Sequence, residues 1–352
     1  MVSAPIDPLG HNINESTMRR LPATLLFIVL AAATVPTLHA DSIEEVMKSA
    51  EQGDKASQFK LGLRYATGKG VKRDLDKAVE WYRKAARQGH KKAQTNLGNL
   101  YRSGRGVEKD YGEAMSWYRK AADQGDTKAK INIAMMYASG QGVDKDEAEG
   151  LKWLHDAASA GDAQAMVHLG TMYKTGKGVE KNYAMSTEWF RLAAAKGDAI
   201  AQHNLGLSYF TGKGNKKDYT ESVEWHRKSA NQGYPPAEYS MGLRYARGNG
   251  IKQNYSEAAK WYRKAAKHSH TSAQNNLGLM YRKGQGVKQD YAQALEWFRK
   301  AAERGHARAQ FNLGNMYLKG EGVKPDREEA RKWFTKAADR GHKGSIKTLN
   351  SM

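Results

Sequence analysis

The chain has 352 residues, a formal net charge of +20 and no cysteine. The absence of cysteine excludes a disulfide framework, so stability has to come from a buried apolar core. The excess of lysine and arginine favours partners that carry negative charge.

Residues 1–40 have the order of an export signal. Two arginines precede a short apolar run over residues 23–35, and a small residue stands at the boundary before the next segment. This order is typical of a cleaved secretory signal peptide, although a polar stretch before it is unusual. Two alternatives stay open: translation starts at Met18, or the segment is kept as a membrane anchor, for which the apolar run is short. We therefore expect a bacterial protein that is periplasmic or secreted.

After this segment the chain repeats itself with a fixed period. Its eight tryptophans lie 36 residues apart: Trp81, Trp117, Trp153, Trp189, Trp225, Trp261, Trp297 and Trp333. A tyrosine, two glycines and an alanine keep the same register in every unit. A strict period of this length predicts a two-helix unit stacked on copies of itself, because each copy buries its apolar face only against its neighbours.

The second unit, residues 92–126, shows how each unit is built. Apolar residues at helical spacing predict a first helix, which we call helix A: Ala93, Leu97, Leu100 and Tyr101. A glycine turn follows, and Asp110 with Glu113 forms a capping-box pattern at the start of a second helix, helix B. One face of helix B is expected to be buried: Ala114, Trp117, Ala121 and Ala122. Gly98 costs about 1 kcal/mol inside helix A, and we expect it to let helix B approach closely.

The pattern of this unit resembles a known repeat. Between Ala93 and Gly125 the chain reads A-Q-x-N-L-G-x-x-Y-x-x-G-x-G-V-x-x-D-Y-x-x-A-x-x-W-Y-R-K-A-A-x-x-G, which is similar to the Sel1-like repeat of the tetratricopeptide-like superfamily. The resemblance implies an all-α fold, a right-handed α/α superhelix of eight helix-turn-helix repeats that serves as a protein-interaction scaffold. Some cysteine-rich members of the family are linked to penicillin binding or hydrolysis, and this chain departs from them because it has no cysteine.

These patterns divide the chain into four parts. Residues 1–40 form the N-terminal extension and signal peptide, and residues 41–53 form an amphipathic capping helix. Residues 54–341 hold the eight repeats, and residues 342–352 form a capping half-repeat. The caps are expected because a terminal repeat otherwise exposes its apolar face.

Positive charge recurs at two places in the unit. One is the loop after helix A, and the other is an Arg-Lys pair after the tryptophan, such as Arg119-Lys120. Two interpretations stay open: attraction to an anionic partner, or a solvated surface that keeps the array soluble. Nucleic acid is not expected as a partner, because export removes the protein from it.

Three positions on helix A differ between units while their neighbours stay the same. If helix A lines the concave face, as the resemblance implies, these positions face a ligand, and the candidate binding residues are Phe59, Arg102, His203, Leu207, Phe210, Tyr239, Leu243, Arg282 and Phe311. The central members predict an aromatic and apolar patch with arginines at its ends. The alternative is that these side chains pack against the neighbouring A helix. The eight tryptophans are assigned a structural role.

Catalytic chemistry is not indicated. The repeated Gly-x-Gly turn lacks the spacing of a phosphate loop, and His268 with His270 has no further residues to complete a metal site. We therefore expect no enzyme, cofactor or metal, and a protein or peptide partner of acidic character. A second interpretation stays open: a protein associated with cell-envelope polysaccharide or peptidoglycan, with or without a hydrolytic activity like that of the beta-lactamase-like members of the family.

Overall fold

The computed structural model describes residues 42–352, and all of its helices belong to one unit, Ile43–Met352. The predicted signal peptide therefore lies outside the described residues. Within residues 42–352 there is no strand, and no helix there has the length and apolar character needed to cross a bilayer.

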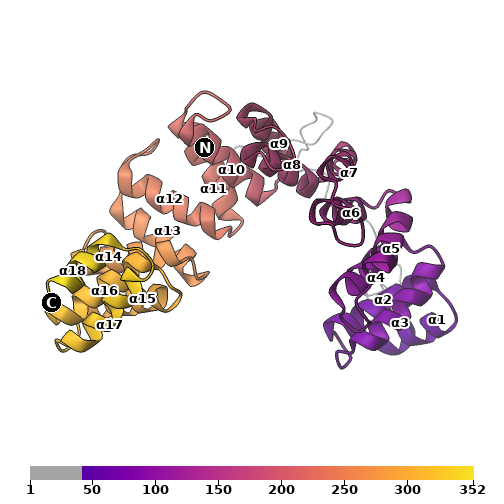
Figure 1. Cartoon of the computed structure of the whole chain (residues 1–352), viewed down its shortest axis with the longest axis horizontal. Helices are drawn as coiled ribbons and strands as arrows, with labels where there is room; N and C mark the ends of the chain where they lie inside the picture. Colours follow the sequence, from indigo (N-terminus) through magenta and orange to yellow (C-terminus); the bar gives the residue numbers. More distant parts are fainter. Residues whose placement is uncertain (1–41) are drawn as a thin grey trace, which may run out of the picture. The chain divides into compact units, whose positions relative to one another are not determined.

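Eighteen helices follow one another through the described residues (Figure 1). The array begins with α1 (Ile43–Glu51) and ends with α18 (Lys343–Asn350). The A helices are α2 (Lys55–Thr67), α4 (Lys91–Ser103), α6 (Thr127–Ser139), α8 (Ala163–Thr175), α10 (Ala199–Thr211), α12 (Pro235–Arg247), α14 (Thr271–Lys283) and α16 (Ala307–Lys319). The B helices are α3 (Leu75–Arg87), α5 (Tyr111–Asp123), α7 (Glu147–Ser159), α9 (Tyr183–Ala195), α11 (Tyr219–Asn231), α13 (Tyr255–Lys267), α15 (Tyr291–Glu303) and α17 (Arg327–Ala338).

Each helix packs against the helix before it and the helix after it. This arrangement confirms the predicted all-α solenoid of two-helix repeats. The buried residues form successive clusters along the array, and no cluster spans all of it. Stability is therefore shared between neighbouring repeats.

The turn between helix A and helix B is held at both ends. In the second repeat the Asp110 side chain accepts a hydrogen bond from the backbone N–H of Glu113 at 2.9 Å, as the capping-box pattern predicts. The second hydrogen bond of a capping box, from the Asp110 N–H to the Glu113 carboxylate, is not formed. The Asp110 N–H donates to the Tyr101 carbonyl at 3.0 Å. The Glu113 carboxylate instead accepts from the indole N–H of Trp117 at 3.0 Å.

In seven of the eight repeats a glycine of helix A lies directly against a ring of helix B. A Cβ added to Gly98 would lie 2.6 Å from the ring of Tyr118, which is below any tolerated contact. The residues at the position of Tyr118 are Tyr82, Tyr118, Leu154, Phe190, His226, Tyr262, Phe298 and Phe334. The predicted reason for the glycine, close approach of helix B, is therefore correct, and the approaching group is this ring.

The third repeat lacks the helix-A glycine, and the residue that faces this position accounts for the difference. Ala134 replaces the glycine there, and the facing residue is Leu154, the only one at this position without a ring. Leu154 and Ala134 belong to the same buried cluster. A branched aliphatic side chain leaves room for a methyl group that a flat aromatic ring does not.

The tryptophans occupy a different place from the predicted one. Trp117 is half-buried and packs against the cluster of the preceding repeat, whereas its neighbour Tyr118 is fully buried. The residue after tryptophan is thus the wedge within a repeat, and tryptophan joins one repeat to the previous one. The sequence analysis placed Trp117 on the buried face of helix B and did not include Tyr118, because both neighbours keep the same period.

A double-mutant cycle tests the contact between glycine and ring. We expect Gly98→Ala to lower the free energy of unfolding by about 1–3 kcal/mol, because the ring has no free volume to retreat into. Tyr118→Leu alone costs stability by leaving a void. The pair Gly98→Ala/Tyr118→Leu reproduces the third repeat, so its cost is expected to fall below the sum by about 1 kcal/mol. Strict additivity in urea unfolding would show that the two residues do not constrain each other.

Candidate functional site

Four of the nine predicted binding residues make ring contacts with the N-cap residue of the helix that opens the next repeat. Two pairs are stacked, Phe59 with His90 at a centroid distance of 4.4 Å and Tyr239 with His270 at 4.6 Å. Phe311 with His342 is tilted at 4.7 Å, and His203 with Tyr234 is edge-on at 5.5 Å. The side chain at this position therefore contacts the residue 31 positions later, at the start of the following repeat.

Three of the histidines in these pairs, His90, His270 and His342, also cap helices. Nδ1 of His90 accepts a hydrogen bond from the N–H of Ala93 at 3.2 Å, and Nδ1 of His270 accepts from the N–H of Ala273 at 3.2 Å. Burial lowers the pKa of both imidazoles. The neutral ring that capping requires is thus favoured, and each histidine serves as a cap and as a stacking surface.

His203 is the most perturbed of the predicted residues. Its ring contacts the fully buried ring of His226 edge-on, with centroids 5.2 Å apart. Burial lowers the pKa of His203 to about 4 and that of His226 to about 3. Nδ1 of His203 and Nε2 of His226 have no hydrogen-bond partner within the described residues, so both imidazoles are neutral and poorly solvated.

Phe210 is held by a residue that the sequence analysis missed. The guanidinium of Arg244 lies 3.4 Å from the centre of the Phe210 ring, and Arg244 is only 3% exposed. Burial lowers the pKa of Arg244 to about 10. The available signal was its position, because other repeats place Leu100, Met136 or Met280 there.

The side chains of the remaining candidates differ in how far they are already engaged in contacts within the protein. Leu243 packs against the buried cluster of the sixth and seventh repeats, and Leu207 lines a cavity. Arg282 binds both carboxylate oxygens of Glu321, at 2.6 and 3.0 Å, so its charge is locally balanced. Arg102 is half-buried and takes part in no ion pair among residues 42–352.

The Arg-Lys row on helix B is part of the packing. Arg119 donates to the Tyr137 hydroxyl of the next repeat at 2.8 Å, and the Lys120 ammonium lies 4.3 Å from the centre of the Trp117 ring. Both contacts recur along the array. Neither of the two interpretations from the sequence included this internal role.

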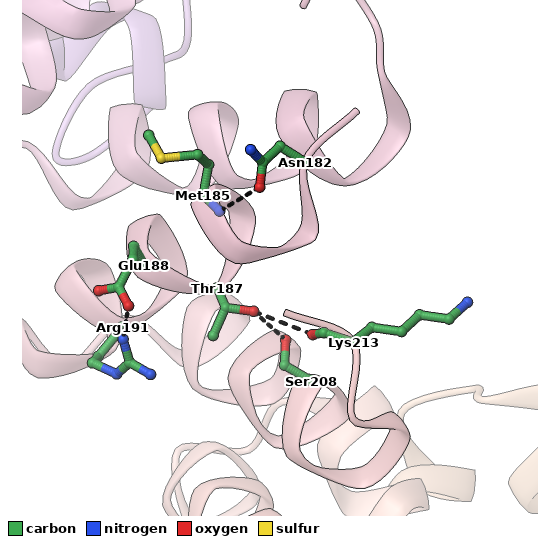
Figure 2. A network of polar contacts seen from close by, with 7 residues as sticks. All are labelled: Asn182, Met185, Thr187, Glu188, Arg191, Ser208 and Lys213. Carbon is green, nitrogen blue, oxygen red and sulfur yellow. Dashed lines mark hydrogen bonds and ion pairs between the residues drawn. The ribbon is translucent and has the colours of Figure 1, made fainter. Parts of the chain in front are cut away.

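A cavity of about 430 Å³ lies between α8, α9 and α10. Its walls include Phe190 and Leu207, and its floor holds the buried Thr187 beside Ser208. The Thr187 hydroxyl lies between the Ser208 hydroxyl at 3.2 Å and the Lys213 carbonyl at 3.4 Å (Figure 2). Of the nine predicted residues, this cavity includes Leu207.

His268 and His270 have separate structural roles. Nδ1 of His268 contacts the buried carboxylate of Glu238 at 3.1 Å, and His270 caps α14. Among residues 42–352, no three metal-ligating side chains come together.

Comparison with known proteins identifies the repeat. The Sel1 repeat family matches eight consecutive stretches: 55–90, 91–126, 127–162, 163–198, 199–234, 235–270, 271–306 and 307–342. The chain belongs to the Sel1 repeat family. The resemblance seen in the sequence motif is thereby confirmed.

Two solved structures and one curated relative are similar to this Sel1 repeat protein. A Sel1 repeat protein from Oxalobacter formigenes is 32% identical with a TM-score of 0.68, covering 89% of this chain and 92% of that one. A protective antigen of uropathogenic Escherichia coli with an SLR fold is 35% identical with a TM-score of 0.60, covering 88% and 74%. The secretory immunoglobulin A-binding protein EsiB of Escherichia coli O6:H1 is 35% identical over 65 residues, which are 18% of this chain and 13% of EsiB.

The buried imidazoles of this Sel1 repeat protein predict acid sensitivity. Their pKa values are lowered in the folded state, so the unfolded chain binds protons first as the pH falls. Stability is therefore complete above about pH 6.5 and is lost toward pH 3–4, with a slope of up to about 1.4 kcal/mol per pH unit for each histidine. We expect His226→Phe to flatten the dependence of the thermal midpoint on pH over this range.

Tyr262→Phe is the matched control, because it changes the same position in the next repeat without removing a group that titrates there. Its pH dependence is expected to parallel that of the unaltered protein. If His226→Phe also left the slope unchanged, the imidazole of His226 would not be held neutral by the fold.

Proposed function

We propose that this Sel1 repeat protein is an exported, non-enzymatic adaptor that binds an acidic protein or peptide segment through its helix-A face. We define this face by three positions in each helix A, which lie two residues before, two after and five after the buried aliphatic residue at the position of Leu97. The carrying observation is apolar surface left uncovered there. Leu63, Met135 and Leu318 stand at these positions and are 42%, 45% and 37% exposed. Exposed apolar side chains that recur along one face are typical of an interaction surface.

The central part of the face combines aromatic and aliphatic groups. Phe210, Tyr239, Leu207 and Leu243 are each half-buried, so a partner can contact the part that remains accessible. The stacked partners of Tyr239 and Phe210 hold these rings in place before binding. Rigid aromatic groups contribute strongly to interfaces because little conformational entropy is lost.

Charge supports an acidic partner. The net charge is +20, and basic side chains in the loops after helix A, such as Lys72, Arg105 and Lys109, are exposed. Such an excess raises the association rate of an acidic partner and weakens binding as salt increases.

The names of two relatives support an interaction outside the cytoplasm. One is called a secretory immunoglobulin A-binding protein, and the other is called a protective antigen. Secretory immunoglobulin A is therefore the first protein to test, although the similarity to EsiB spans 13% of that protein.

The test is capture of a protein partner by immobilised residues 41–352, first from purified secretory immunoglobulin A and then from secreted and periplasmic fractions. We expect Phe210→Ala with Tyr239→Thr to reduce capture at least tenfold, because a central aromatic anchor contributes about 1–2 kcal/mol or more. Both replacements occur naturally at these positions, as Ala66 and Thr95, so the fold is expected to persist.

The matched control is Tyr255→Ala with Tyr291→Ala, which removes two exposed aromatic residues from B helices. It is expected to leave capture unchanged. Equal capture by both double variants would exclude the helix-A face. Elution of all bound protein by moderate salt would indicate that surface charge alone holds the partner, and retention by peptidoglycan in place of protein would favour the polysaccharide alternative.

A further inference from the structure

The cavity between α8, α9 and α10 exists because two large apolar residues are missing from it. At the position of Ser208 five of the other seven repeats carry Leu100, Met136, Met172, Met280 and Met316, and the first and sixth carry Arg64 and Arg244. At the position of Thr187 they include Val79, Met115, Leu151, Val223 and Leu295. In the second and third repeats the corresponding pair, Met115 and Met136, shares one buried cluster. Replacing such a pair by Thr187 and Ser208 removes the side chains that would fill this space.

The floor of the cavity is polar where the rest of the array is apolar. Thr187 is 1% exposed, and its hydroxyl donates toward Ser208 or the Lys213 carbonyl. The Ser208 hydroxyl donates to the Asn204 carbonyl at 3.2 Å. Because the Ser208 donor is used internally and Ser208 is only partly buried, its hydroxyl oxygen can accept a hydrogen bond from a guest.

Three lysines surround the opening, and no acidic residue lines the cavity. The Lys174 ammonium donates to the Asn204 side chain at 3.0 Å, while the ammonium groups of Lys181 and Lys213 lie 5.0 and 5.2 Å from the centre of the Tyr183 ring. Desolvation of the ammonium lowers the pKa of Lys174, although the residue is exposed as a whole, and Lys213 adds repulsion. A negative charge placed among the three ammonium groups would offset the repulsion between them.

We propose that this cavity binds a small anion, a carboxylate or phosphate, carried on an apolar body with a hydrogen-bond donor at its far end. The anion lies among the three lysines, the body contacts Tyr183 and Leu207, and the donor reaches the partly buried Ser208. The volume of about 430 Å³ falls within the roughly 300–1,000 Å³ of small-molecule sites. This site does not depend on the proposed protein partner, and the anion is either a free molecule or a group presented by that partner.

Calorimetry with three probes tests the chemistry. We expect saturable binding of 4-hydroxybenzoate and phenyl phosphate, with affinity falling as salt increases, and no binding of the uncharged 4-hydroxybenzamide. Thr187→Leu with Ser208→Met fills the cavity with residues that other repeats use. This variant is expected to lose at least tenfold in affinity for 4-hydroxybenzoate without a fall in its thermal midpoint.

Charge variants supply an independent arm. Lys213→Gln is expected to weaken binding of both anions three- to tenfold, whereas Lys109→Gln, remote from the cavity, leaves it unchanged. The proposal is overturned if neither anion binds, if 4-hydroxybenzamide binds equally well, or if the filled variant keeps its affinity.

Competition between phenyl phosphate and a captured partner shows where the anion comes from. Release of a captured partner by excess phenyl phosphate shows that the partner supplies the group, and retention shows that the ligand is a free molecule. If the unaltered protein binds the probes but captures no partner, only the proposed function is contradicted.

Discussion

The contact between a helix-A glycine and the helix-B ring that faces it sets the distance between the two helices in seven of the eight repeats. Across seven repeats, a Cβ added to the glycine would come within 2.4–2.9 Å of that ring. The helices are therefore as close as the ring allows, and the N–H to carbonyl bond from Asp110 to Tyr101 fixes the turn between them. Arg119 and its equivalents then join one repeat to the next by donating to a tyrosine hydroxyl, and tryptophans such as Trp117 pack against the cluster of the preceding repeat.

Departures from this framework concentrate in the fourth to sixth repeats. Thr187, Ser208 and His226 put polar groups where other repeats have aliphatic or aromatic ones, and Arg244 buries a guanidinium. Each of these residues carries a cost in desolvation or lost packing. Polar residues retained in a repeated core at such a cost are typical of functional sites, where stability is reduced in favour of recognition.

Much of the fold could be predicted because the period is strict and the turn chemistry is local. The tryptophan spacing indicated the repeat, and Asp110 indicated where helix B begins. The periodicity could not decide between Trp117 and Tyr118, since both recur, and the identity of the ring varies between repeats. The partner of Gly98 was therefore missed even though its role was inferred.

The candidate site was less predictable because its contacts join residues far apart in sequence. Stacking of Tyr239 on His270 and pairing of Arg282 with Glu321 both cross between repeats. The cavity depends on Thr187 facing Ser208, which no single helix pattern reveals. The sequence indicated the cavity only through two polar residues at positions that are apolar in most other repeats. Recognising that the two belong to one site required knowing that α9 packs against α10.

The most direct measurement compares stability and binding in one variant that restores the framework. Thr187→Leu, Ser208→Met, His226→Phe and Arg244→Met together replace the departures with residues of other repeats. The account predicts a higher thermal midpoint and a loss of binding of 4-hydroxybenzoate. A more stable protein that binds as well as before would contradict the claim that these departures are the site of recognition.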